Sequence, residues 1–145
     1  MDESLQDCPL STPRLQLRRP AERDAASIVA IAGDWEVARR LARIPHPYTQ
    51  EHFRFFMDSV VPEEPTWVIV WRQTAQLIGV IGLHPNDDGQ SAEVGYYIGR
   101  PFWGQGFATE AARIIVQAGF DVFRCVKLTS GYQADNLASG RVLEK

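Results

Sequence analysis

The sequence predicts a single α/β domain of the α+β type, in which a mixed β-sheet is flanked by helices. Residues 92–99 are rich in aromatic and β-branched residues, as strands are, and they precede a glycine loop and a long apolar helix over 108–121. Two apolar runs, 66–71 and 77–83, are separated by a short linker and indicate an antiparallel hairpin. Residues 127–133 predict a strand parallel to 92–99, because a helix crosses between them.

The length and composition of the chain are those of a soluble globular domain. Its 145 residues suffice for one buried core, and 45% of them are hydrophobic and 23% charged. The net charge of −3 argues against a nucleic-acid partner, which usually requires a basic surface. No apolar run has the length of a membrane span, and the N-terminus is acidic rather than rich in Lys and Arg. We therefore expect a cytoplasmic protein with no membrane partner.

Cysteine and histidine usage gives no sign of a disulfide framework or a metal site. Cys8 and Cys125 are too few to form such a framework. His46, His52 and His84 show no metal-ligand spacing with one another or with a cysteine. We assign no metal.

In the N-terminal half the elements are short and are marked by prolines, glycines and caps. Residues 1–12 predict a flexible leader, and 13–145 form the folded domain. Alternation over 15–18 predicts the first strand, and apolar residues at helical spacing predict a helix from near Pro20 to Gly33. Asp34 caps a second helical segment that continues to Leu41.

A stronger helix is predicted over 49–60. Thr49 is a good N-cap, although His52 three residues later does not complete a capping box. Phe53, Phe56 and Met57 share one face of this helix. They are either core residues or contacts for a substrate.

The loop of residues 103–109, Trp-Gly-Gln-Gly-Phe-Ala-Thr, opens the long helix and carries the clearest functional signal. The first turn of a helix has main-chain N–H groups without intrahelical acceptors, and the helix dipole adds positive charge there. Glycines at 104 and 106 would let a phosphate approach the amides of 105–109. A dinucleotide fingerprint would need a glycine in place of Thr109, and no Gly-Lys-Ser/Thr of a P-loop is present. The alternative is a tight turn into a core helix.

Three segments resemble those of a known family. Residues 95–111, Gly-Tyr-Tyr-Ile-Gly-Arg-Pro-Phe-Trp-Gly-Gln-Gly-Phe-Ala-Thr-Glu-Ala, closely resemble the acetyl-coenzyme A loop of the GNAT N-acetyltransferases. Residues 136–145 resemble the closing segment of the ribosomal-protein (RimJ/RimL-like) branch, and 45–49 more weakly resemble its entry to the second helix. The resemblance implies a mostly antiparallel central sheet with a parallel, splayed strand pair at the cofactor site.

The resemblance also implies a function and a set of binding residues. The expected reaction transfers an acetyl group from acetyl-coenzyme A to a primary amine, either a protein N-terminal α-amine or a small-molecule amine. The alternative is a coenzyme A-binding module of the same fold without transfer activity. The residues implied in cofactor binding are Tyr97, Ile98, Trp103, Gly104, Gln105, Gly106, Phe107, Ala108, Thr109 and Asn136.

Two residues are candidates for catalysis on the same grounds. Glu93 lies where other members of the superfamily have a glutamate base, but it could instead pair with a neighbouring arginine, and a water chain could then serve an α-amine. Ser139 lies where this branch has a hydroxyl near the sulfur, and it would protonate the leaving thiolate or simply begin a helix. Asn136 would bind the pantetheine arm, hold a water or cap that helix.

The family continues beyond the segment that matches 136–145, with two further strands. The chain lacks these two strands of the family, so we expect the edge of the 127–133 strand to be uncovered. The expectation is a form of low activity, or a homodimer through this edge.

Overall fold

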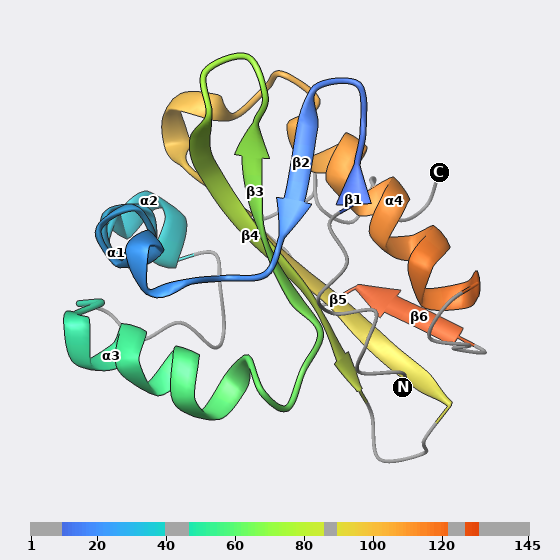
Figure 1. Ribbon diagram of the computed structural model, residues 1–145, viewed down its shortest axis with the longest axis horizontal. Helices are drawn as coiled ribbons and strands as arrows, with labels where there is room; N and C mark the ends of the chain where they lie inside the picture. Colours follow the sequence, from blue (N-terminus) through green and yellow to red (C-terminus); the bar gives the residue numbers. More distant parts are fainter. Residues whose placement is uncertain (1–9, 40–46, 86–89, 122–126, 131–145) are drawn as a thin grey trace.

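The computed structural model describes residues 10–39, 47–85, 90–121 and 127–130. Its centre is a six-stranded sheet in the order β1 to β6 (Figure 1). The strands are β1 Leu10–Ser11, β2 Leu15–Arg18, β3 Thr66–Trp71, β4 Gln76–Pro85, β5 Ser91–Ile98 and β6 Lys127–Ser130. Neighbours from β1 to β5 pair antiparallel, and β6 pairs parallel to β5. The predicted mixed, mostly antiparallel sheet is confirmed.

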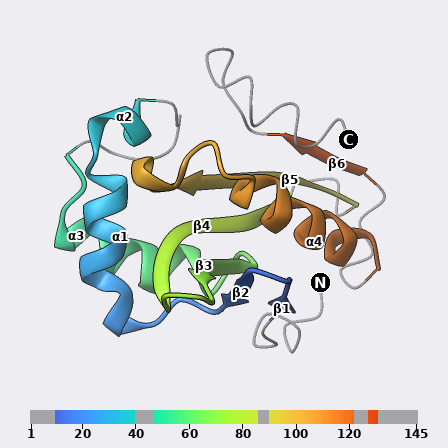
Figure 2. The ribbon, with the colours of Figure 1, turned by 90° about the horizontal axis from the view of Figure 1, so that it is seen from above.

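Helices cover both faces of this sheet. The short turn η2 (Glu22–Asp24) leads into α1 (Ala25–Ala32), and α2 (Trp35–Ala38) follows directly. The next helix is α3 (Gln50–Phe55), which continues as the π-helical turn η3 (Phe56–Val60). The turn η4 (Arg100–Phe102) precedes α4 (Phe107–Asp121). Figures 1 and 2 show α1, α2 and α3 together on one side of the sheet, with α4 on the other.

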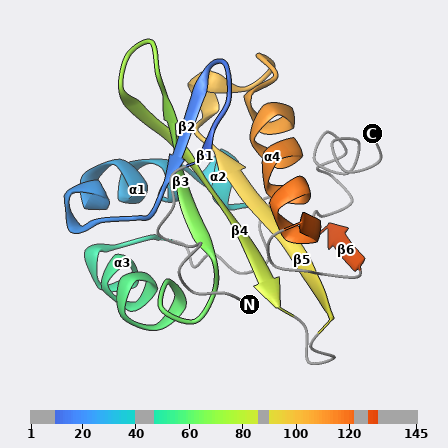
Figure 3. The same ribbon diagram turned by 45° about the vertical axis from the view of Figure 1, so that its right-hand side comes forward.

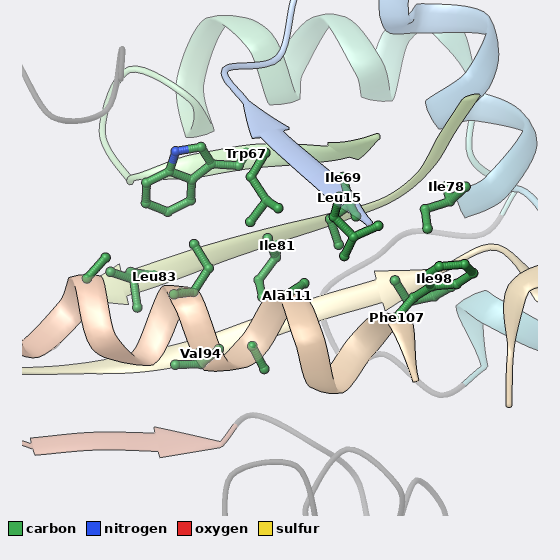
Figure 4. Close-up of a cluster of buried hydrophobic side chains, with 14 of the residues drawn as sticks. Leu15, Trp67, Ile69, Ile78, Ile81, Leu83, Val94, Ile98, Phe107 and Ala111 are labelled. Carbon is green, nitrogen blue, oxygen red and sulfur yellow. The ribbon is translucent and has the colours of Figure 1, made fainter. Parts of the chain in front are cut away.

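The core consists of two apolar clusters, one on each face. The larger cluster lies between the sheet and α4, where Ile81, Val94 and Ala111 are buried (Figure 4). The second cluster lies under α1 and α3 and contains Ile28, Phe53 and Val80. Phe53 is therefore a core residue, and Phe56 and Met57 pack partly buried against the same cluster.

The two faces of β5 can be assigned from these clusters. Ala92, Val94 and Ile98 belong to the cluster under α4, whereas Tyr97 packs against the cluster under α1 and α3. Successive strand residues point to opposite faces. Glu93 therefore shares the α1 and α3 side with Tyr97, and Gly95 lies between them on the strand.

The structure corrects the end of the predicted leader. Leu10 and Ser11 form β1, which pairs with Leu17 and Gln16 of β2, so that the strand predicted as the first is the second. A tight turn makes this possible, because the Thr12 N–H donates to the Leu15 carbonyl at 2.9 Å. The remaining leader residues, 1–9, lie outside the described residues.

His52 also differs from its prediction. The Thr49 N–H donates to His52 Nδ1 at 3.0 Å, so this ring supplies the returning half of a capping box, which Glu or Gln usually provides. Asp34 caps α2 as predicted, since its side chain accepts from the Glu36 N–H at 3.0 Å. The segments predicted at 40–41, 131–133 and from Asn136 onward lie outside the described residues.

Candidate active site

The C-terminal part of β5 has a free edge, because the parallel strand β6 pairs only with the first part of β5. β6 pairs with β5 only from Ser91 to Val94, and Figure 3 shows it beside the N-terminal part of β5. β5 continues to Ile98, and within the described residues no strand pairs with its last part on that side. An extended ligand could therefore add to this edge as a further strand would.

The direction of the main chain shows which residues face this edge. The Gly99 N–H donates to the Ile78 carbonyl of β4, and the Tyr97 carbonyl lies 2.4 Å from a Cβ built on Gly79, so both residues face β4. Main-chain groups of successive strand residues point to opposite sides. Those of Ile98 therefore face the open edge. Sequence analysis assigned both Tyr97 and Ile98 to pantetheine binding, and only Ile98 has this direction.

The loop before α4 has the geometry that anion binding requires. Gly104 and Gly106 have φ angles of 78° and 81°, in the left-handed region that glycine enters without strain. The first helical hydrogen bond runs from the Glu110 N–H to the Gly106 carbonyl at 3.1 Å. The N–H groups of Phe107, Ala108 and Thr109 therefore precede the hydrogen-bonded part of the helix, at its positive end. The N–H groups of these three residues could therefore donate hydrogen bonds to a pyrophosphate.

Two side chains of the loop act on the loop itself. The Trp103 indole N–H donates to the Ile98 carbonyl at 2.7 Å, and so ties the loop to the end of β5. The Gln105 amide donates to the Pro101 carbonyl at 3.3 Å. Phe107 is buried in the core beside Ile98 (Figure 4), where its ring centroid lies 5.2 Å from that of Trp71. Trp103, Gln105 and Phe107 thus hold the shape of the loop.

A residue from the other end of the chain, Arg14, fixes the loop from outside. Its guanidinium donates to the Gln105 carbonyl at 2.9 Å and lies over the Phe107 ring, 4.4 Å from the centroid. The same side chain pairs with Glu110, with Nε to Oε1 at 2.7 Å. The Gln105 carbonyl points toward Arg14. The N–H groups of the loop can therefore face the side opposite Arg14.

Glu110 is the anchor for this arrangement. It accepts hydrogen bonds from the Arg14 N–H at 3.0 Å and from the Thr12 hydroxyl. Burial alone would raise the pKa of Glu110, but the hydrogen bonds from Thr12 and Arg14 hold it below its ordinary value. We name the contacts of Thr12, Arg14 and Glu110 the β2–α4 latch. Sequence analysis missed it, because Arg14 and Glu110 are 96 positions apart and no local pattern links them.

Glu93 lies where β4, β5 and β6 meet. It is half-buried, and its Cα partners are His84 on β4 and Thr129 on β6. Among the described residues its carboxylate takes part in no ion pair, so the alternative of an arginine partner is not found there. Glu93 thus precedes Val94, the last residue of β5 that pairs with β6.

His84, which sequence analysis considered only as a metal ligand, has a carboxylate partner. Its Nδ1 forms an ion-pair contact with Glu64, which precedes β3. Within the described ranges, no three His, Cys, Asp or Glu side chains are grouped closely enough to bind a metal ion. Asn136 and Ser139 lie outside the described residues, as do the residues of the weaker family motif up to His46.

The comparisons with known proteins agree with this geometry. A family model described as an acetyltransferase (GNAT) domain matches residues 14–145. The chain is 31% identical over 141 residues to the uncharacterized N-acetyltransferase YoaA of Bacillus subtilis, covering 94% of this chain and 80% of that protein. A GNAT-family acetyltransferase structure from Bacillus anthracis superimposes with a TM-score of 0.83 at 21% identity, over 94% of this chain and 81% of the other.

Two further solved structures have the same fold and named substrates. One is a putative ribosomal-protein-serine acetyltransferase from Vibrio cholerae, with a TM-score of 0.73 and 21% identity over 96% of this chain and 82% of that one. The other is spermidine N-acetyltransferase from Vibrio cholerae in complex with CoA and spermine. Its TM-score is 0.77 at 20% identity, over 92% of this chain and 79% of that chain. At such identities the likeness concerns the fold.

Proposed function

The chain belongs to the GNAT acetyltransferase family and is an acetyl-coenzyme A-dependent N-acetyltransferase, and we propose that its acceptor is a primary amine. The acceptor is either a protein N-terminal α-amine or a small-molecule amine. Structures of this fold include one named for a ribosomal-protein serine and one named for spermidine, which supports keeping both classes. We further propose a place in the ribosomal-protein (RimJ/RimL-like) branch and a cytoplasmic location. No helix in the described ranges combines the length and the apolar character that crossing a membrane requires.

The observation that carries this proposal is the pairing of the glycine loop with the free edge of β5. In the proposed complex the main-chain amides of 105–109 hold the pyrophosphate, and Gly104 and Gly106 let it approach. The N–H of Ile98, whose carbonyl already accepts from the Trp103 indole, binds the pantetheine arm at the free edge. Acetyl-coenzyme A, when bound, would supply an activated acetyl thioester to the amine.

Glu93 is the proposed base, acting directly or through an ordered water. It lies two residues before the free edge, and within the described residues it has no cationic partner that would occupy it. A base is needed because the attacking amine must be neutral, and an α-amine with an ordinary pKa of about 7.7–8.0 needs less help than a lysine. A main-chain N–H of β5 would stabilise the oxyanion. Ser139 is the proposed donor to the thiolate, and Asn136 a further ligand for the arm.

Transfer and binding can be separated by experiment. We expect the protein to release free thiol from acetyl-coenzyme A when a panel of peptide N-termini, polyamines and other small amines is offered. Mass spectrometry of the acceptor should then show one added acetyl group. Binding of coenzyme A by calorimetry without thiol release for any amine would favour the alternative, a binding module that lacks transfer activity.

The role of Glu93 has its own test. Glu93→Gln should lower kcat and flatten the pH–rate profile, while the affinity for coenzyme A stays as in the unmodified protein. Glu51→Gln, which changes an exposed glutamate on α3, is the matched control and should leave the profile unchanged. Normal turnover of Glu93→Gln across the pH range would show that Glu93 has only a structural role.

A homodimer through the edge of β6 is a further proposal. Within the described residues β6 is the last strand of the sheet and pairs only with β5. Edge strands present unpaired main-chain groups to other chains. We expect light scattering after size exclusion to give the mass of a dimer, and proline substitution at Leu128 to shift it to the monomer. A fully active monomer in the unmodified protein would contradict this proposal.

A further inference from the structure

A row of polar residues crosses the sheet on the face opposite α4. His84 of β4 and Glu93 of β5 are directly opposed in the antiparallel register, so their side chains share one face with Cβ atoms about 4.5–5.5 Å apart. Thr66 of β3 pairs with Gly82 of β4. Continuing that register by two residues sets Glu64 opposite His84. Three titratable residues thus follow one another across three neighbouring chain segments.

The position of Glu64 in this row is fixed by its neighbours. The Leu83 N–H donates to the Pro65 carbonyl at 2.9 Å, and the Thr66 hydroxyl donates to the Glu64 carbonyl at the same distance. These bonds hold the segment before β3 against β4. The Glu64 carboxylate then contacts Nδ1 of His84. His84 and Glu64 are both only partly exposed, which limits competition from water.

This contact orients the imidazole. A carboxylate accepts hydrogen bonds, so the nitrogen that faces Glu64 is the protonated one, and in the neutral ring the other nitrogen, Nε2, is an acceptor. The same arrangement of carboxylate and histidine prepares a histidine as a base in other enzymes. Because Glu64 contacts Nδ1, Nε2 is left for another partner. In the row, the neighbour of His84 on the side away from Glu64 is Glu93.

Two glycines lie next to this row, on β4 and β5. Gly82 and Gly95 are directly opposed, and each is two residues from one member of the His84 and Glu93 pair. A Cβ built on Gly95 meets no atom within 4 Å. As far as the described residues go, the face beside Glu93 is therefore open near Gly95, which leaves room for an acceptor amine.

From this row we propose that His84, oriented by Glu64, is the proton-relay partner of Glu93 in acetyl transfer. The proposal rests on the proposed function. Glu93, directly or through a water, takes one proton from the acceptor ammonium and passes it to Nε2 of His84. The neutral amine then forms the C–N bond with the acetyl carbonyl, and the C–S bond breaks with its electron pair on sulfur. The second amine proton goes to the thiolate, and His84 releases the first to solvent.

Within the row itself, the charged neighbours of His84 are acidic. They are Glu64 on the segment before β3 and Glu93 on β5, and Thr66, Gly82 and Gly95 beside the row are uncharged. Lys127, on β6, pairs with Ser91 two positions from Glu93. His84 thus lies between two acidic residues of the row.

The test uses the full chain and combines kinetics with NMR. Thiol release is followed against pH for His84→Gln, Glu64→Gln and the control Glu63→Gln, which changes the exposed neighbour of Glu64. His84→Gln should lower kcat about tenfold or more and remove the acid limb of the profile. Glu64→Gln should shift that limb, and the affinity for coenzyme A and the profile of Glu63→Gln should stay unchanged.

The NMR readout does not depend on activity. Nitrogen shifts should show the His84 ring protonated at Nδ1, and this form should be lost in Glu64→Gln. The ring shifts of His84 should also change in Glu93→Gln, because the ring then loses its cross-strand carboxylate. Unchanged His84 ring shifts in Glu93→Gln, or normal kinetics of His84→Gln beside an active unmodified protein, overturns the relay and leaves the proposed function standing. Absence of transfer to every amine in the unmodified protein overturns both.

Discussion

Gly106 is the residue at which the cofactor loop tolerates least change. Its φ of 81° excludes side chains without strain, and a Cβ there would lie 3.3 Å from Nη2 of Arg14. Gly106→Val should weaken coenzyme A binding at least tenfold, which is ~1.4 kcal/mol in calorimetry. Gly104→Ala is the comparison at a second positive φ, since φ is 78° there and an added Cβ meets no protein atom within 4 Å. Unchanged coenzyme A affinity in Gly106→Val, with the fold intact, would contradict this prediction.

Tyr48, in the apolar cluster under α1 and α3, makes the stability of the protein depend on pH in the alkaline range. Burial raises the pKa of Tyr48 from 10.0 to about 12. A raised value means that the folded state keeps a proton that the unfolded state loses. Its contribution to stability is therefore fully present below pH 10.0 and is lost as pH rises toward about 12. The urea midpoint should fall over this interval in the unmodified protein and fall less in Tyr48→Phe. Identical curves would contradict this.

Single residues also mark where prediction from sequence ends. The positive φ angles of Gly104 and Gly106 follow from a glycine loop before a helix, and both are found. The capping role of His52 was not predicted, because a histidine ring is an unusual acceptor at that position. The direction of Tyr97 toward β4 depends on the register of β5, which no local pattern contains.

At the scale of elements, β2 connects the sheet to both helical layers. Arg14, just before β2, pairs with Glu110 of α4 on one face. Arg18, at the end of β2, pairs with Asp24 beside α1 on the other, with Nη2 to Oδ1 at 2.8 Å. Apart from β1, the strands and the longer helices could be predicted from periodicity and caps. Which side chain pairs across 96 positions could not, because it depends on how the elements pack.

The β2–α4 latch gives a prediction about cofactor binding without contact to the reacting atoms. Arg14→Ala should weaken coenzyme A binding roughly tenfold, ~1.4 kcal/mol, because the Gln105 carbonyl loses its donor and the loop amides lose their orientation. Glu110→Gln should have a smaller effect of the same sign. In a double-mutant cycle the two effects should not add, since one side chain acts through the other.

The control for the latch is Arg113→Ala, which removes an exposed arginine from the same helix. Its affinity for coenzyme A should match that of the unmodified protein, so that loss of positive charge near the site is tested separately. Additive effects of Arg14→Ala and Glu110→Gln, or an equal loss in Arg113→Ala, would mean that the latch does not orient the loop.

For the whole molecule, the two arginine–carboxylate pairs on either side of the sheet predict how the protein unfolds in acid. Asp24 is 4% exposed, and burial alone would raise its pKa, but the hydrogen bonds from Arg18 and the Ala21 N–H hold it below the ordinary 3.8. The pKa of Glu110 is likewise held below 4.5. A lowered value means that the unfolded state binds the proton more readily. The stability from each pair is therefore present above these ordinary values and is lost as pH falls through the folded ones.

Chemical unfolding at a series of pH values should show this loss in two independent parts. Asp24→Asn should cost about 1.5–3 kcal/mol near neutral pH and remove one part of the acid dependence, and Glu110→Gln should remove the other. Because the pairs lie on opposite faces and share no residue, the effects of the two variants on the free energy of unfolding should add. Glu51→Gln, on the exposed side of α3, should leave the curve as it is. If the double variant keeps the acid dependence of the unmodified protein, the carboxylates that control acid unfolding lie elsewhere and β2 does not hold the two layers through these pairs.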